Sequence, residues 1–264
     1  MQVTVLDLLA AKREGRRFVM VTAYDYPTAR LLAEAAIPVL LVGDSVGNNA
    51  LGYASTLPVT MEEMLHSARA VARAAPTRLL VGDMPFGSYH ESTAQAIGNA
   101  AAFLKAGMHA VKLEGGGWVV EVAAALVERG IPVMGHVGLT PQSQNAQGGF
   151  RVQGRDEPAR ARILADAQAL ERAGCFGLVL EGVPRDLAAV VTTTVTIPTI
   201  GIGAGPDCDA QVLVVYDLLG MTRGHMPKFA KAYADLGDRA VAAARAFADE
   251  VGAGRFPDDA HSYH

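Results

Sequence analysis

The chain has 264 residues, of which half are apolar and 19% are charged, and its formal net charge is −4. This balance excludes a nucleic-acid surface, which needs a basic patch, and the apolar runs fall short of the roughly 18–20 residues of a membrane span. Two cysteines, Cys175 and Cys208, are too few for a disulfide framework or a zinc cluster. The N-terminus has its basic residues after its apolar segment, the reverse of a signal peptide. Composition therefore predicts a soluble, intracellular protein of enzyme size.

Eight segments along the chain have the pattern of buried strands. Most are continuous apolar runs rather than alternating ones, as in strands that helices cover on both faces. The predicted strands are residues 18–25, 39–45, 78–84, 110–115, 132–139, 177–182, 198–205 and 212–220.

Helical segments separate most of these strands. Pro27 stands in the first turn of a helix that residues 28–36 continue, and Thr60 with Glu63 forms a capping box for a helix over 60–74. The interval 206–211 is too short for a helix. The other predicted helices are 92–106, 118–129, 157–173, 185–194 and 228–251.

This alternation predicts a (β/α)8 TIM barrel, with a doubly wound open sheet as the alternative. No Ser/Pro-rich linker, charge block or low-complexity tract interrupts the chain. A barrel of about 250 residues commonly forms one domain. Residues 1–264 are therefore predicted to be a single catalytic domain with a short N-terminal lead and a C-terminal tail.

Four of the apolar runs end in a carboxylate, at Asp44, Asp83, Glu114 and Glu181. The gaps between them are 39, 31 and 67 residues, close to one, one and two strand-plus-helix units of about 30 residues or more. The exits of parallel strands are where ligands bind in such folds. The spacing therefore predicts an acidic mouth at one end of the barrel.

The first three acids end adjacent predicted strands, which lie about 4.8 Å apart in a sheet. The carboxylates of Asp44, Asp83 and Glu114 could converge on one hard cation such as Mg²⁺, which prefers oxygen ligands. The alternative is that each acid caps the helix that follows it. Three acids at one mouth favour a metal or substrate site over three separate caps.

Lys112 precedes Glu114 by two residues, which places both side chains on one face of a strand. A lysine inside a barrel is costly without a partner. It either binds the carboxylate of an anionic substrate, which we favour, or only neutralises Glu114. Ser45 could donate a hydrogen bond at the same mouth, or it could be an N-cap.

No Lys or Arg lies within three residues of Glu181 in the sequence. A carboxylate in a dry pocket has a raised pKa, which suits a general base, and a helix cap is the alternative. His136 is either a hydrogen-bond donor in the substrate pocket or a core histidine. GIGAG (201–205) fits a phosphate-binding turn or a tight turn equally well, and the long loop 48–60 is a candidate lid.

A series of motifs spans the chain from TAYD (22–25) to the HSYH end. They are GDSVGNNALGYASTLPVT (43–60), DMPFGSY (83–89), VKLEGG (111–116), GHVGLTPQS (135–143), GGFRVQGR (148–155), LEGVP (180–184), IGIGAG (200–205) and HMPKFAK (225–231). Together they resemble the successive motifs of the ketopantoate hydroxymethyltransferase family. The resemblance covers nearly the whole chain and is more specific than any single motif.

The resemblance implies a (β/α)8 barrel with Mg²⁺ and with 5,10-methylenetetrahydrofolate as one-carbon donor. It also implies a cytoplasmic homo-oligomer, often a decamer of two pentameric rings, that acts on a small ketoacid and not on nucleic acid or membrane. By motif, Glu181 resembles the proton acceptor of the family. The metal site that it implies is Asp44, Asp83 and Glu114, and the ketoacid-binding set is Asp44, Ser45, Asp83 and Lys112. Two places depart from the commoner family pattern, Asn48–Asn49 in the lid and Gly182 after the base.

The implied reaction moves a hydroxymethyl group from the folate to 3-methyl-2-oxobutanoate and gives ketopantoate for pantothenate synthesis. Mg²⁺ would polarise the keto group, Glu181 would remove the C3 proton, and Lys112 with Ser45 would hold the carboxylate. A phosphoenolpyruvate mutase- or lyase-like barrel is the rival enzyme, although neither cysteine stands at a strand exit beside acids. A barrel that only binds a ligand, or serves as a scaffold, is the third hypothesis.

Overall fold

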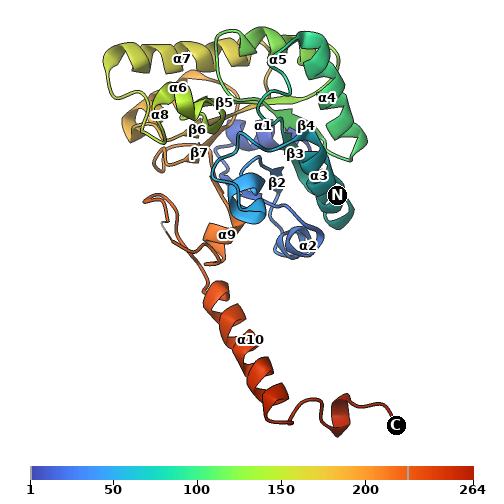
Figure 1. Ribbon diagram of the computed structural model, residues 1–264. Helices are drawn as coiled ribbons and strands as arrows, with labels where there is room; N and C mark the ends of the chain where they lie inside the picture. The colour runs from blue at the N-terminus through green and yellow to red at the C-terminus, as the bar shows by residue number, and fades with distance from the viewer. Residues whose placement is uncertain (1, 225) are drawn as a thin grey trace. The chain divides into compact units, whose positions relative to one another are not determined.

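The computed structural model describes residues 2–224 and 226–264. Eight parallel strands form a closed barrel in chain order (Figure 1). The first strand pairs with the last, with Phe18 opposite Ala210, so the predicted barrel is confirmed and an open sheet is excluded. The strands are β1 (Phe18–Thr22), β2 (Val39–Val42), β3 (Leu79–Asp83), β4 (Ala110–Lys112), β5 (Val133–Gly138), β6 (Gly177–Glu181), β7 (Thr199–Ile202) and β8 (Ala210–Leu213).

Helices cover the outside of the barrel (Figure 1). The helix after β2 begins where the capping box predicts, because the backbone N–H of Thr60 donates to the Glu63 carboxylate at 2.8 Å and that of Glu63 donates to Thr60 Oγ1 at 3.2 Å. Such a pair satisfies two donors that have no partner inside the helix. The outer helices are α2 (Tyr26–Glu34), α3 (Met61–Ala74), α4 (Thr93–Lys105), α5 (Val119–Val127), α7 (Glu157–Arg172) and α8 (Arg185–Thr194).

A further helix, α1 (Val5–Arg13), is not predicted by the patterns described above. Leu8 of this helix is buried in the same apolar cluster as Met20 and Val39 of the barrel. The backbone N–H of Val3, just before α1, donates to the carbonyl of Thr77, which precedes β3, at 2.9 Å. The helix therefore packs across the amino-terminal end of the barrel. Its apolar residues do not form a single stripe, so periodicity does not reveal it.

The eighth strand is predicted over 212–220, and that boundary is wrong. β8 occupies Ala210–Leu213, and a short helix, α9 (Val215–Leu218), follows it. A continuous apolar run does not by itself distinguish a strand from a buried helix. The position of β8 is instead set by its hydrogen-bonded pairing with both β1 and β7.

The last long helix also begins later than predicted. The prediction covers 228–251, whereas α10 is Leu236–Gly252. The backbone N–H groups of Tyr233 and Leu236 donate to the carbonyls of Leu218 and Leu219. Tyr233 before α10, and Leu236 at its first position, therefore bond to the segment around α9, and the stretch before Leu236 does not continue the helix.

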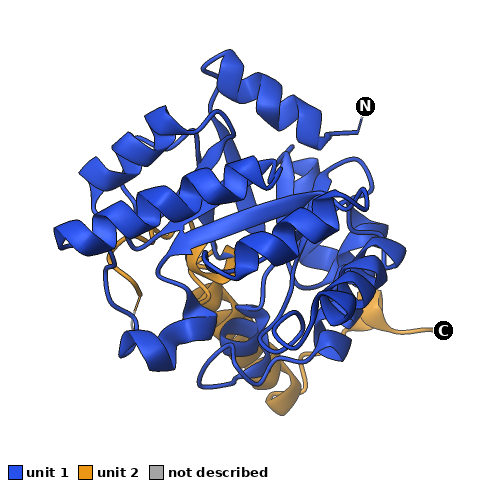
Figure 2. Ribbon diagram, turned by 90° about the horizontal axis from the view of Figure 1, so that it is seen from above, with its two compact units in different colours: residues 1–214 blue, residues 215–264 orange. Residues whose placement is uncertain are grey.

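Two compact units divide the chain after residue 214 (Figure 2). Residues 1–214 contain the complete barrel, and residues 215–264 contain α9, α10 and η3 (Asp259–His261). The assignment of 1–264 to a single domain stays a prediction, and His225 of the last family motif lies outside the described residues. Across the described part of the chain, no helix has the length and hydropathy needed to cross a bilayer.

The interior of the barrel is apolar at its base. Inward side chains from successive strands pack into one cluster, which makes the interior a filled core rather than a pore. Members of this cluster include Met20, Leu41, Val81, Met134, Val179, Ile200 and Val212. The polar residues of the site continue these same inward rows toward the carboxyl ends of the strands.

Candidate active site

Alternation along the strands carries charged side chains into the barrel mouth. Successive strand residues point to opposite faces, so residues two apart share the inward row. Asp44 comes from the turn that follows β2. In four other strands, an inward core residue is followed two positions later by an inward polar residue. These pairs are Val81 and Asp83, Ala110 and Lys112 (with Glu114 two residues further), Met134 and His136, and Val179 and Glu181.

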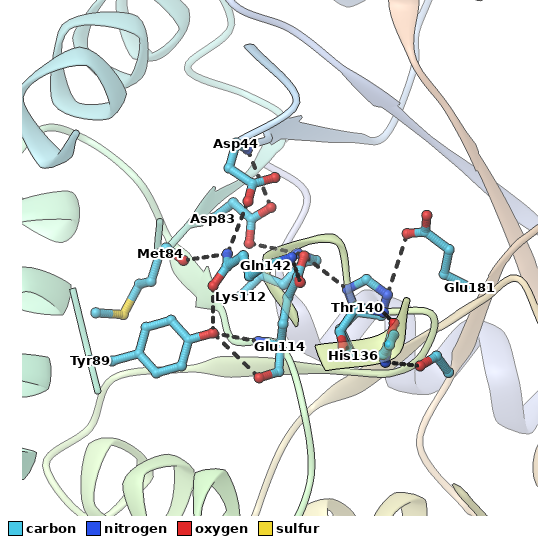
Figure 3. A network of polar contacts seen from close by, with 12 residues as sticks. Asp44, Asp83, Met84, Tyr89, Lys112, Glu114, His136, Thr140, Gln142 and Glu181 are labelled. Atoms are coloured by element: carbon cyan, nitrogen blue, oxygen red, sulfur yellow. Dashed lines mark hydrogen bonds and ion pairs between the residues drawn. The ribbon is translucent and has the colours of Figure 1, made fainter. Parts of the chain in front are cut away.

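Asp44, Asp83 and Glu114 lie together, as their spacing predicts. One carboxylate oxygen of each lies within 4.8 Å of the others, and all three residues are buried. The ammonium of Lys112 lies among them and donates to Asp83 Oδ1 at 2.6 Å and to Glu114 Oε1 at 3.3 Å (Figure 3). Lys112 therefore does offset the charge of Glu114, but its closer partner is Asp83.

In the described part of the chain, none of the four strand-end acids caps a helix. The N-cap positions of the helices that follow these strands hold Thr60, Ser92, Trp118 and Pro184. Helix capping therefore does not explain the acids. A buried charge costs several kcal/mol unless it is paired, so the cluster needs a compensating partner.

The cluster carries more negative charge than its lysine offsets. Three carboxylates surround one ammonium among the described residues, so full ionisation leaves two charges uncompensated. Burial, reinforced by the charges of Asp83 and Glu114, raises the pKa of Asp44 well above its usual value. Burial acts in the same direction on Glu114, but Lys112 and His136 outweigh it and lower the pKa of Glu114 to about 2. A divalent cation would balance the two charges, and the all-oxygen donor set fits Mg²⁺ rather than zinc.

Glu181 lies on the other side of the mouth, and the His136 ring stands between it and the cluster (Figure 3). The Nδ1 atom of His136 is 3.4 Å from Glu114 Oε1, and its Nε2 atom is 3.4 Å from Glu181 Oε2. Burial raises the pKa of Glu181 to about 7, although His136 acts to lower it. A carboxyl group with a pKa near neutrality can accept a proton and release it again at physiological pH.

Gln142 is the main residue of the site that the sequence patterns do not reveal. Its side-chain amide donates to Asp44 Oδ2 at 3.0 Å and to the Met84 carbonyl at 2.9 Å, and its backbone N–H donates to Glu114 Oε2 at 3.1 Å. The Tyr89 hydroxyl donates to Gln142 Oε1 at 2.8 Å and so orients the amide (Figure 3). The sole sequence signal for Gln142 is its place in a family motif, because no periodicity links it to residues so distant along the chain.

A cavity of about 100 Å³ is lined by both the acidic cluster and Glu181. Polar side chains line part of this cavity, and apolar residues of the barrel interior, such as Met20, Leu41 and Val212, line the rest. A single water needs about 10–15 Å³ of such space. The cavity therefore has room for several waters or one small organic acid, and it is smaller than the pockets that hold drug-sized ligands.

Ser45 also lines this cavity, and its hydroxyl lies 2.8 Å from that of Tyr24. The residue at the N-cap of the next turn, η1 (Gly47–Leu51), is Val46, so Ser45 does not have the N-cap role. The rest of loop 48–60 folds back and brings Thr56 to the cavity. Its function as a lid stays a prediction.

The GIGAG run (201–205) begins in the last two residues of β7 and continues into a turn. Gly203 and Gly205 have φ values of +62° and +80°, a backbone conformation that glycine adopts without steric cost. The tight-turn explanation therefore accounts for both glycines, and the phosphate-binding role stays a prediction.

A parallel barrel with carboxylates and a lysine buried at the carboxyl ends of its strands defines a class, the TIM-barrel proteins with a small-molecule site at the mouth. The sequence model of the ketopantoate hydroxymethyltransferase family matches residues 2–259. A relative from Moorella thermoacetica is 55% identical, and the match covers 99% of this chain and 98% of the relative. A relative from Streptomyces coelicolor is 54% identical, and the match covers 100% of this chain and 90% of the relative. Both relatives are named 3-methyl-2-oxobutanoate hydroxymethyltransferase. The chain therefore belongs to the ketopantoate hydroxymethyltransferase family, a family of transferases, and the resemblance of its motifs is confirmed.

Solved structures with the same fold are more distant in sequence. Phosphonopyruvate hydrolase in complex with oxalate and Mg²⁺ superimposes with a TM-score of 0.63 at 17% identity, over 100% of this chain and 92% of its own. 2,3-Dimethylmalate lyase, a member of the PEP mutase/isocitrate lyase superfamily, superimposes with a TM-score of 0.62 at 18% identity. The match covers 99% of this chain and 92% of the lyase chain. At such identities the likeness establishes the barrel alone, and membership in the transferase family rests on the sequence relatives.

Proposed function

We propose that this protein transfers a hydroxymethyl group from 5,10-methylenetetrahydrofolate to 3-methyl-2-oxobutanoate, giving 2-dehydropantoate for pantothenate and coenzyme A synthesis. The observation that carries this proposal is that the acidic cluster around Lys112 and the separate carboxylate Glu181 line one small cavity. Family membership and the names of relatives about half identical in sequence support the same reaction.

Mg²⁺ is the proposed cofactor. Asp44, Asp83 and Glu114 would hold it, since they supply oxygen donors and two uncompensated negative charges. When bound, the ion supplies Lewis-acid polarisation of the substrate keto oxygen. Lys112 keeps a fixed positive charge beside Asp83 and Glu114, which limits the repulsion among the carboxylates.

The ketoacid is proposed to bind with its carboxylate toward the polar lining and its branched alkyl group toward the apolar lining. Lys112 uses two of its three N–H donors on Asp83 and Glu114, which leaves one for the ligand. Ser45, Asp44 and Asp83 complete the proposed ketoacid-binding set. Each ring nitrogen of His136 lies 3.4 Å from a carboxylate oxygen, of Glu114 or of Glu181, without a well-aligned hydrogen bond to any described residue, which supports a place for this residue in the same pocket.

Glu181 is the proposed general base. It accepts the C3 proton of the ketoacid, and the electron pair of the broken C–H bond forms an enolate. The folate, opened as an iminium, supplies the methylene carbon. Water adds to this carbon, its bond to the folate nitrogen breaks, and the nitrogen leaves with a proton as tetrahydrofolate. The enolate carbon forms its bond to the methylene carbon, whose water-derived oxygen takes up a proton and becomes the hydroxyl group. Holding the carboxylate through Ser45 and Lys112 presents one face of the enolate to this carbon.

The assembly and location of the protein are proposed from the family resemblance. It supports a cytoplasmic homo-oligomer, a decamer of two pentameric rings, that acts on small molecules. Light scattering of the purified protein measures the assembly directly, and a mass other than that of ten chains contradicts the decamer.

One assay tests the reaction. Formation of ketopantoate is measured with purified protein in the presence and absence of Mg²⁺ and of methylenetetrahydrofolate. We expect product only when both are supplied. Full activity after removal of divalent metal by EDTA would contradict the metal site, and product formed without folate would contradict the donor.

A further inference from the structure

One buried hydroxyl in the cavity has no hydrogen-bond partner among the residues that the structure describes. Thr56 is 4% exposed, and its side chain lines the same cavity as Asp44, Lys112 and Glu181. Its Oγ1 atom forms no hydrogen bond with any residue that the structure describes. Buried polar groups in folded proteins are nearly always paired, and an unpaired one is unfavourable. A ligand that accepts a hydrogen bond from Thr56 would remove this cost.

The backbone of Thr56 is hydrogen-bonded, although its side-chain hydroxyl is not. The Thr56 carbonyl accepts a hydrogen bond from the backbone N–H of Val59 at 3.1 Å. Val59 is buried against Gly47, where an added Cβ would lie 2.6 Å from the Val59 Cγ2 atom. The loop is therefore packed closely onto the turn that follows Asp44. This packing holds the Thr56 side chain at the cavity.

We propose that Thr56 is a binding residue for the 2-oxo acid, with its hydroxyl donating a hydrogen bond to the carboxylate of the ligand. The inference rests on the function proposed above. Ionised carboxylates of the cluster cannot donate. The ammonium of Lys112 has one N–H donor left after Asp83 and Glu114, whereas the carboxylate of the ligand has two oxygens that accept hydrogen bonds. The Ser45 hydroxyl already lies 2.8 Å from that of Tyr24. Thr56 therefore supplies a donor that no group in residues 2–224 or 226–264 uses.

Ser88 offers a matched comparison within the same barrel. It is 5% exposed, and its hydroxyl likewise has no hydrogen-bond partner among the described residues. It is not one of the residues that line the cavity. A variant of Ser88 therefore removes an unpaired buried hydroxyl without touching the proposed ligand.

The test measures binding of 3-methyl-2-oxobutanoate to the full-length protein with Mg²⁺ by isothermal titration calorimetry. Thr56→Val keeps the shape of the side chain and removes the donor, so we expect the Kd to rise about tenfold or more. We expect the melting temperature to stay the same or rise, because no protein hydrogen bond is lost. Thr56→Ser keeps the hydroxyl and is expected to retain most of the affinity. Ser88→Ala is expected to leave the Kd unchanged.

The outcomes separate this inference from the proposed function. If the wild-type protein binds the ketoacid and Thr56→Val binds it equally well, Thr56 is not a ligand contact and the proposed function stands. A lower melting temperature in Thr56→Val, with no recovery of affinity in Thr56→Ser, would also overturn the inference, because the residue would then be structural. Failure of the wild-type protein to bind the ketoacid with Mg²⁺ present would contradict the proposed function itself.

Discussion

The two sides of the barrel mouth hold their carboxylates in different surroundings. On the side of β2 to β4, Asp44, Asp83 and Glu114 gather within 4.8 Å around one lysine. On the side of β6, Glu181 stands apart, with the His136 ring 3.4 Å away. Crowding creates a site for positive charge, whereas burial of a separate carboxylate raises its pKa to about 7. The same residue type at the same end of the barrel thus acquires different chemistry from its neighbours.

The largest effect is expected on the Glu181 side. Glu181→Gln keeps the shape of the side chain and removes the proton acceptor. We expect exchange of the C3 proton of the ketoacid in deuterated water, followed by NMR, to fall about 10²–10⁴-fold. Mg²⁺ and ketoacid affinity should change little, since the acidic cluster is intact. Exchange at the wild-type rate would remove Glu181 as the base and with it the proposed contrast between the two sides.

The complementary change is on the crowded side. Asp83→Asn removes one charged oxygen donor and the closest partner of Lys112. We expect the affinity for Mn²⁺, measured by electron paramagnetic resonance, to fall about 100-fold. Loss of a residue that only orients a metal ligand lowers metal affinity about 10–100-fold, and loss of a ligand should lower it at least as much. Glu181→Gln is the control and should bind Mn²⁺ normally. An unchanged metal titration of Asp83→Asn would count against the metal site.

A smaller effect is expected for Gln142, which donates hydrogen bonds to two carboxylates of the acidic cluster. Gln142→Met removes the amide that donates to Asp44, so we expect Mn²⁺ affinity to fall about tenfold. Gln147→Met is the matched control, since its amide lies in the same segment and donates to Thr140 Oγ1 at 3.0 Å. Equal losses in both variants would mean that the segment is merely disordered, and that Gln142 does not orient the cluster.

The pH dependence of C3 proton exchange tests whether Glu181 differs from an ordinary carboxylate. The base must be ionised, and burial raises the pKa of Glu181 to about 7. We therefore expect the rate of C3 exchange to fall about tenfold for each pH unit below 7 and to level off above it. A rate that stays constant from pH 5 to pH 8 would show that the base has an ordinary pKa and is not held in a dry site.

The smallest expected effect is on stability. Folding raises the pKa of Glu181 from 4.5 to about 7, so the folded state binds the proton more tightly than the unfolded chain. The resulting stabilisation is fully present below pH 4.5 and is lost as the pH rises through 7. Glu181→Gln removes this dependence, so at pH 8 its free energy of unfolding should exceed that of the wild type by about 1–3 kcal/mol. Urea denaturation at pH 4 and pH 8 measures the difference, and equal values at pH 8 would contradict the raised pKa.

The barrel could be predicted because its strands are marked by local patterns. Continuous apolar runs with helices between them identify parallel strands, and Thr60 with Glu63 marks the start of α3. Local patterns do not identify an element where the same run of residues fits both a strand and a helix. The apolar run at 212–220 fits a strand and a helix equally well. The bounds of β8 follow only from its hydrogen-bonded pairing with β1 and β7. The helix α1 has no apolar stripe, so only its packing on the barrel base reveals it.

The strand-end acids of the site could also be predicted, because local patterns mark the strands that they end. Spacing by strand-plus-helix units puts Asp44, Asp83, Glu114 and Glu181 at one end of the barrel, and a separation of two residues puts Lys112 on the same face as Glu114. Gln142 and Thr56 could not be found in this way, since Gln142 lies in the single 3₁₀ turn η2 (Pro141–Ser143) and Thr56 lies on a loop. No periodicity governs loop residues, and their contacts with the cluster and the cavity form only when the barrel closes.

By itself, the sequence determined the barrel, the end at which its charged residues gather, and, through its motifs, the family. These properties depend on residues close together in the chain, whose periodicity is set by strand and helix geometry. The tertiary structure alone decided how closely three of the carboxylates approach one another, that Glu181 stands apart beside His136, and which side chains outside the strands meet them. Charge balance and burial depend on distances between segments far apart in sequence, and those distances exist only in the folded barrel.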